Sequence, residues 1–140
     1  MRYPQEIITE KWGDILKFSC PDNSDEAFFD VDFIINSDAI DINAEIIPHR
    51  HDFYQLIWCL EGDGVHVMDF DKADIRKGRI FFCAPEQCHS AKDTSKIPKG
   101  YGIMFNDAFI SELNSNFVYE IKYLFFRRYG RKQYLDISPE

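Results

Sequence analysis

The sequence predicts a mainly β fold, an antiparallel β-barrel or sandwich that is followed by two C-terminal α-helices. Two observations support this prediction. Short apolar runs recur between clusters of turn-forming residues, at the spacing of roughly eight to twelve residues that is typical of all-β domains. From Asn106 onward, the apolar residues change from the period of a strand to the period of a helix.

Strands are expected from residue 28 onward, because residues 1–27 are polar and weakly patterned. Gly, Asn, Asp and Ser mark the turns between the strands, for example at Asn36-Ser37-Asp38 and at Glu61–Gly64. The expected strands are residues 28–35, 39–47, 53–60, 65–69, 73–77, 79–84 and 101–105.

Two helices are expected after the last strand. Asn106 is a suitable N-cap for a helix over residues 107–113. A second helix is expected over residues 116–128, and it carries more apolar residues than one buried face can use. This helix is either enclosed within the domain or presents a second apolar face to a partner, and the candidate dimerisation residues on it are Phe117, Ile121, Leu124, Phe125 and Phe126.

Composition and charge limit the classes of function. A chain of 140 residues can bury one core without a disulfide or a structural metal. Its formal net charge of −8 should repel phosphate backbones, so the chain alone is a poor candidate for DNA binding. The four cysteines form no CxxC pair and no apolar leader precedes them, which favours a reduced, cytoplasmic protein without membrane spans.

The histidines form the most informative pattern. Three of the four lie in two short segments of the sequence. Residues of equal parity in a strand share a face, so His49, His51 and Gln55 should point the same way, and His89 could reach them from another strand. Such a set is typical of a metal site or of the polar floor of a ligand pocket. His66 lies outside both segments and is expected to be structural.

These residues resemble the two sequence motifs of the cupins. The positions with the cupin spacing are His49, His51, Gln55 and Gly62 in the first segment, and Gly78 and His89 in the second. Ala84 and Glu86 stand where the second motif has Pro and Gly, and Asn43 stands where the first motif begins with Gly. The resemblance implies a cupin-like barrel, that is, a double-stranded β-helix or jelly roll.

A longer resemblance covers residues 45–112. The segments PHRHDFYQLIWCLEGDGVHVMDF, KGRIFFCAPEQCHS and YGIMFNDAFI resemble the N-terminal domain of AraC-type transcription regulators. The terminal LDISPE resembles the linker that leads, in these proteins, toward a pair of helix-turn-helix motifs. The resemblance implies a sensor domain that binds a small effector in its barrel and pairs with a second copy of itself through its C-terminal helices.

This resemblance also implies a division of the chain. Residues 1–106 would form the cupin barrel sensor, residues 107–135 the helical dimerisation segment, and residues 136–140 the start of a linker to a DNA-binding domain. Ser138, Pro139 and Glu140 have the pattern of a helix start, so we expect the natural protein to continue. DNA would be a partner only through that further domain.

The leading hypothesis is a ligand-sensing and dimerisation domain that binds a small effector, with sugars among the candidates. Aromatic side chains on the same strand run could stack on such an effector, although strand aromatics are often core residues. The candidate effector-binding residues are His49, His51, Gln55, His89, Phe53, Trp58 and Tyr54. Effector entry is expected to move either the N-terminal segment 1–27 or the loop 91–100.

The alternative hypothesis is a small metal-dependent cupin enzyme, an oxygenase or an isomerase. It would use a divalent transition metal on His49, His51, Gln55 and His89. Glutamine is a weaker ligand than a carboxylate, and Asp52 lies on the wrong strand face to serve as a general base. We therefore expect neither catalytic residues nor a required cofactor.

Overall fold

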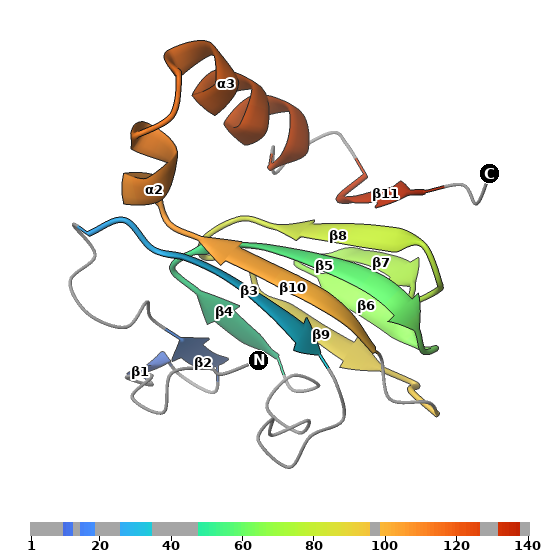
Figure 1. Cartoon of the computed structure of the whole chain (residues 1–140). Helices are drawn as coiled ribbons and strands as arrows, with labels where there is room; N and C mark the ends of the chain where they lie inside the picture. The colour runs from blue at the N-terminus through green and yellow to red at the C-terminus, as the bar shows by residue number, and fades with distance from the viewer. Residues whose placement is uncertain are drawn as a thin grey trace.

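The computed structural model describes residues 10–12, 15–18, 26–34, 48–95, 99–126 and 132–137. Two β-sheets face each other, and the helices lie on the outer side of one sheet (Figure 1). The mainly β fold class expected from the sequence is confirmed. Among the described residues no strand belongs to both sheets, so the barrel is not closed. No described helix has the length and apolarity that crossing a bilayer requires.

The six-stranded sheet contains both histidine segments. Its strands, in spatial order, are β1 (Glu10–Trp12), β2 (Ile15–Phe18), β4 (His49–His51), β9 (His89–Lys92), β6 (Val65–Met68) and β7 (Asp71–Asp74). Neighbouring strands are antiparallel, except that β2 runs parallel to β4. The N-terminal strand β2 therefore lies directly beside the strand that carries His49 and His51.

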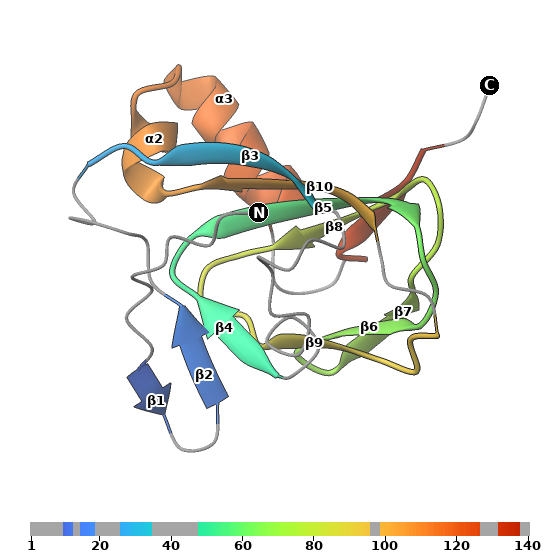
Figure 2. The same cartoon turned by 60° about the horizontal axis from the view of Figure 1, so that its bottom comes forward.

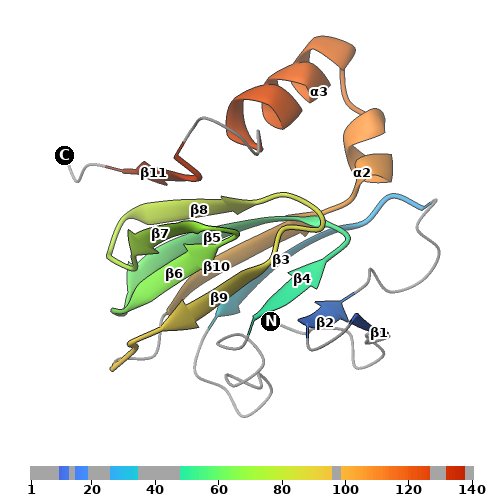
Figure 3. The same cartoon turned by 180° about the vertical axis from the view of Figure 1, so that it is seen from behind.

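The five-stranded sheet forms the other layer, as the turned view in Figure 2 shows. Its strands, in spatial order, are β11 (Tyr134–Asp136), β8 (Arg79–Cys83), β5 (Tyr54–Glu61), β10 (Lys99–Phe105) and β3 (Phe29–Ile34). All its neighbours are antiparallel. The view from behind in Figure 3 shows β11 at the free edge, next to β8.

The helices cover the outer face of the five-stranded sheet. They are α2 (Asp107–Ser111), α3 (Ser115–Glu120) and the π-helix η1 (Ile121–Phe125). The buried residues between them and the sheet are Tyr54, Phe82, Ala84, Phe105, Ile110 and Phe126. Asn106 caps α2, because its side chain accepts a hydrogen bond from the backbone N–H of Phe109, as the sequence predicted.

The second helix differs from its prediction. Of the candidate dimerisation residues, Phe117 is 51% exposed, but Phe126 is only 7% exposed and belongs to the core. Ile121, another of these candidates, packs against that core together with Val118. The wider π turn shifts the phase of the residues that follow it, and a helical period taken from sequence cannot anticipate that shift. The side chains of Leu124 and Phe125 lie outside the described residues.

The described strands β1, β2, β9 and β11 were not among those expected. β1 and β2 lie in the segment 1–27, which has little apolar alternation, so pairing with β4 holds β2 in place despite the weak pattern. β7 begins at Asp71, before the expected start, because the turn occupies only Asp69 and Phe70. The strand expected over residues 39–47 lies outside the described residues.

Candidate functional site

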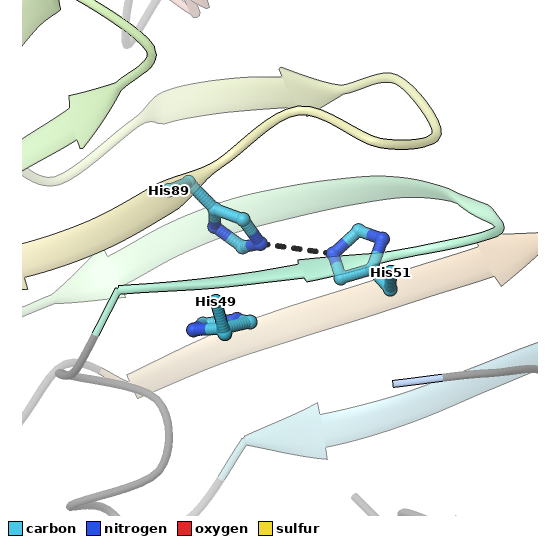
Figure 4. A group of neighbouring side chains, drawn as sticks. All are labelled: His49, His51 and His89. Carbon is cyan, nitrogen blue, oxygen red and sulfur yellow. Dashed lines mark hydrogen bonds between the residues drawn. The ribbon is translucent and has the colours of Figure 1, made fainter. Parts of the chain in front are cut away.

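Strands β4 and β9 bring three histidines together inside the barrel. In the register of these strands His49 is the partner of His89, and His51 lies on the same face of β4 as His49. His49 and His51 are 0% exposed and His89 is 2% exposed. Figure 4 shows the three imidazoles gathered from the two neighbouring strands.

Gln55 reaches the same point from the opposite sheet. The chain bends after β4 and enters β5. The side chain of Gln55 therefore faces back toward the histidines, and it is 0% exposed. Gln55 Oε1 lies 3.0 Å from Nε2 of His51. The convergence of His49, His51, Gln55 and His89 that their spacing suggested is therefore present in the structure.

One carbonyl group fixes the order of hydrogen bonds in the cluster. The carbonyl of Phe53 can only accept, so Nδ1 of His51, at 2.9 Å, carries the proton. Nε2 of a neutral His51 then accepts, and it receives the N–H of His89 Nε2 at 2.9 Å. This order requires the carboxamide of Gln55 to turn so that its NH2 group, which is otherwise buried without a partner, faces Nε2 of His51 in place of Oε1. Nδ1 of His89 is left as an acceptor, and it faces Nε2 of His66 at 3.4 Å and Sγ of Cys83 at 3.7 Å.

Burial keeps these imidazoles neutral. Desolvation, followed by the charge of His49, lowers the pKa of both His51 and His66 to about 4. Desolvation, together with the three neighbouring histidines, also lowers the pKa of His89 well below its usual value. Near neutral pH, His51, His66 and His89 are therefore neutral donors and acceptors.

His49, His51 and His89 could hold a metal ion. Their ligand atoms lie within 4.8 Å of one another. Two bonds of about 2.1 Å at a right angle would separate their ligand atoms by about 3.0 Å, and the His51 contacts with His89 and Gln55 measure 2.9 and 3.0 Å. Imidazole and carboxamide groups carry no negative charge as ligands, however, so a divalent ion would keep its full charge in a buried site, which is costly.

A cavity of about 420 Å³ adjoins the cluster. It lies where strands β6, β7 and β8 face the C-terminal segment that includes β11. His66 belongs both to the wall of this cavity and to the histidine cluster. The lining residues are His66, Met68, Asp71, Lys72, Ala73, Phe81, Lys132, Gln133 and Tyr134.

The aromatic candidates on strand β5 separate into two groups. Phe53 is 3% exposed and stacks on His51, with 4.2 Å between ring centroids. Tyr54 and Trp58 point to the opposite face of β5, where Tyr54 packs under the helices and donates to Asp107 at 3.1 Å. Only Phe53 among the three lies against the histidines, because successive strand residues alternate between faces.

Sequence reasoning missed His66 and Cys83. Both are buried, at 7% and 0% exposure, and both face the interior beside His89. The alternation of β6 placed His66 with Met68 on one face, but only the pairing of β6 with β9 shows which histidine it meets. All four histidines of the chain therefore belong to one cluster.

Glu86 replaces a glycine of the cupin motif and has a positive φ angle. Glu86, which stands at the position of the motif glycine, has a φ of 67°. Gln87 supports the same turn by accepting from the N–H of Ala84 at 2.8 Å and donating to Asp69 at 3.1 Å. Glu86 therefore adopts the left-handed backbone conformation that glycine favours, in the turn that precedes His89.

Comparison with known proteins agrees with this geometry. Residues 36–97 match the family model described as the AraC-like ligand binding domain. The match includes β4 to β9, and therefore both histidine segments and most of the cavity wall. A search of curated proteins found no match. The resemblance noted in the sequence is thus confirmed, because residues 36–97 of this chain are similar to the AraC-like ligand binding domain.

Proposed function

We propose that this chain is the ligand-sensing domain of an AraC-type transcription regulator and that it binds a small effector in the cavity beside the histidine cluster. The observation that carries the proposal is the cavity of about 420 Å³, most of whose lining residues lie in the segment matched by a ligand-binding family. Small-molecule pockets in proteins measure roughly 300–1,000 Å³. A regulatory role, rather than catalysis, accords with that family.

The lining favours a polar effector with at least one flat face, and a sugar has this chemistry. Asp71, Lys72 and Gln133 offer directional hydrogen-bonding groups, and Phe81 and Tyr134 offer rings. His66 lies at the inner wall. Behind it the cluster of His89, His51, His49, Gln55 and Phe53 would form the polar floor and hold the tautomer of His66.

The cavity also suggests how binding is transmitted. Lys132, Gln133 and Tyr134 line it and come from the segment that follows the helices. The backbone N–H of Phe82 donates to the carbonyl of Gln133 at 3.0 Å, which fastens this segment to β8. An effector that contacts residues 132–134 can shift the C-terminal segment between a docked and an undocked arrangement, if it binds these two arrangements with different affinity.

The partners would then be a second copy of the chain and, through a further domain, DNA. Exposed rings lie on the outer side of the helices: Phe117, Tyr119 and Tyr123 are 51%, 61% and 42% exposed. Tyr119 and Tyr123 stack with centroids 5.1 Å apart. This surface is where we place the homodimer contact, and the helix-turn-helix domain would follow the linker in the cytoplasmic regulator.

Filling the cavity tests the proposal. Ala73 lines the cavity and is the register partner of His66, so Ala73→Leu should lower effector affinity at least about tenfold while the domain still folds. Val67, on the opposite face of β6, supplies the matched control Val67→Leu. Calorimetric titration with a panel of mono- and disaccharides measures both. Equal affinity of a binding sugar for both variants would show that the effector binds elsewhere.

The metal-dependent enzyme remains the second candidate, because the separations of His51 from His89 and Gln55 suit a shared ion. Metal analysis of protein purified without a chelator or a metal-affinity tag tests it. Near-stoichiometric divalent metal that is lost on His51→Ala would favour the enzyme. Binding of an organic effector without metal would favour the sensor.

A further inference from the structure

A second set of potential ligands lies on the other side of His89. His66, Cys83 and His89 come from the three strands β6, β8 and β9 and are 7%, 0% and 2% exposed. Nδ1 of His89 lies 3.4 Å from Nε2 of His66 and 3.7 Å from Sγ of Cys83. All three ligand atoms lie within 4.8 Å of one another. Neither His66 nor Cys83 belongs to the cupin motifs.

These separations are those of ligands around one ion. Metal bonds of about 2.05 Å to nitrogen and about 2.3 Å to sulfur, at angles between about 110° and 120°, give about 3.4–3.6 Å between nitrogens and about 3.6–3.8 Å between nitrogen and sulfur. Both distances to His89 agree with this range. The three strands therefore hold the side chains close to a coordinating arrangement.

The hydrogen-bond order directs the lone pair of His89 to this side. When Nδ1 of His51 donates to the carbonyl of Phe53 and the Gln55 carboxamide presents its NH2 group, Nε2 of His51 accepts the N–H of His89. Nδ1 of His89 is then the nitrogen available to a metal. A ligating histidine ordinarily donates its other N–H to a partner that fixes the ring, and His51 is that partner here.

We propose that His66 Nε2, Cys83 Sγ and His89 Nδ1 form a buried three-coordinate site for monovalent copper. Thiolate and imidazole are ligands that Cu(I) accepts, and thiolate sulfur favours it. The thiol of Cys83 loses its proton to solvent on binding, and copper enters and stays as Cu(I). One thiolate neutralises Cu(I), whereas Zn(II) would leave one positive charge among buried neutral groups.

The site goes beyond the proposed sensing of a small organic effector. His66 lines the cavity, so the cavity offers an entry path for the ion. A metal ion held by His49, His51 and His89 would bind the lone pair of His89 Nε2. The copper site instead requires that Nε2 keeps its proton and that Nδ1 binds the ion. The two sets are therefore alternatives, and His51 acts as a positioning residue for copper.

Competition against a chromogenic Cu(I) chelator, under anaerobic reducing conditions, tests the site in the whole chain. Wild type should take up one equivalent of Cu(I), and copper X-ray absorption should show one sulfur and two nitrogen ligands. Cys83→Ser and His66→Ala should each weaken binding about a hundredfold or more, a larger loss than removal of a residue that only orients a ligand.

Two other thiols provide controls. Cys59 is buried and Cys88 is half-buried. Cys59→Ser should therefore cost as much packing as Cys83→Ser. Neither Cys59→Ser nor Cys88→Ser should change copper affinity. Circular dichroism verifies folding, and Cys83→Ala replaces Cys83→Ser if the serine variant unfolds. Unchanged Cu(I) affinity in the folded Cys83 and His66 variants, or stronger binding of Zn(II) than of Cu(I) by wild type, would overturn the assignment. Sugar titration of the same variants reports separately on the effector pocket.

Discussion

Replacing Asn106 by alanine should destabilise the domain strongly, because its carboxamide joins two parts of the chain that are distant in sequence. Oδ1 accepts from the backbone N–H of Phe109 and from that of Phe28, both at 2.9 Å. Nδ2 donates to the carbonyl of Glu26 at 2.6 Å. Asn106 is 5% exposed, so little water can replace it. The side chain therefore fixes the start of α2 to the residues that lead into β3.

The expected loss follows from these contacts. Removing an N-cap costs about 1 kcal/mol, and leaving the half-buried N–H of Phe28 without its acceptor costs about 1–2 kcal/mol more. Glu26 is exposed, so its carbonyl can turn to water at little cost. The sum is about 2–3 kcal/mol, which lowers Tm by roughly 10 °C in a domain of this size.

Urea denaturation of a matched set of variants measures the effect. Asn114 caps α3 through a single bond of 3.0 Å to the N–H of Asn116 and is exposed, so Asn114→Ala should cost only about 0.5–1 kcal/mol. Asn106→Asp keeps both accepted bonds and should retain most of the stability. If Asn106→Ala and Asn114→Ala lose equal free energy of unfolding, the reasoning about the buried carboxamide is refuted.

Three further outcomes are expected. Phe126→Ala should lose about 3–5 kcal/mol because it empties the core under the helices, whereas Phe117→Ala should leave stability within about 0.5 kcal/mol and weaken self-association in sedimentation experiments. Gly100→Ala should prevent folding as judged by circular dichroism, because a Cβ there would collide with the carbonyl of Trp58. Burial raises the pKa of Cys59 to about 11, whereas the thiol of the unfolded chain ionises near 9.0. The free energy of unfolding should therefore fall by about 1.4 kcal/mol per pH unit between these values, and Cys59→Ala should flatten that slope.

The features that depend on the alternation of apolar and polar residues along a strand were largely predictable from the sequence. The expected strands over residues 53–60 and 79–84 correspond to β5 and β8. The expected convergence of His49, His51 and Gln55 is also present, although Gln55 reaches the histidines from the opposite sheet and not from the same strand face. Alternation identifies which residues share a face, and it does so from local sequence alone. Which strands then become neighbours depends on contacts between distant segments.

The remaining features depend on such contacts. His66 meets His89 only because β6 pairs with β9, and Tyr134 meets Phe81 because β11 pairs with β8. The π turn at Ile121 is equally invisible to a fixed helical period. Local patterns therefore located the histidines but gave neither the copper ligands nor the cavity.

The two walls of the cavity have different origins, and this bears on specificity. His66, Asp71 and Phe81 lie within the segment 36–97 that matches the ligand-binding family, whereas Gln133 lies beyond it. The family match thus covers strands β4 to β9 and the part of the cavity wall that they carry, and the C-terminal segment supplies the rest of the lining. Because that segment follows the helices, the groups that select an effector and the chain that would carry its signal are partly the same residues. Substitutions in residues 132–134 should therefore alter effector choice and response together, while substitutions at His66 should alter binding alone.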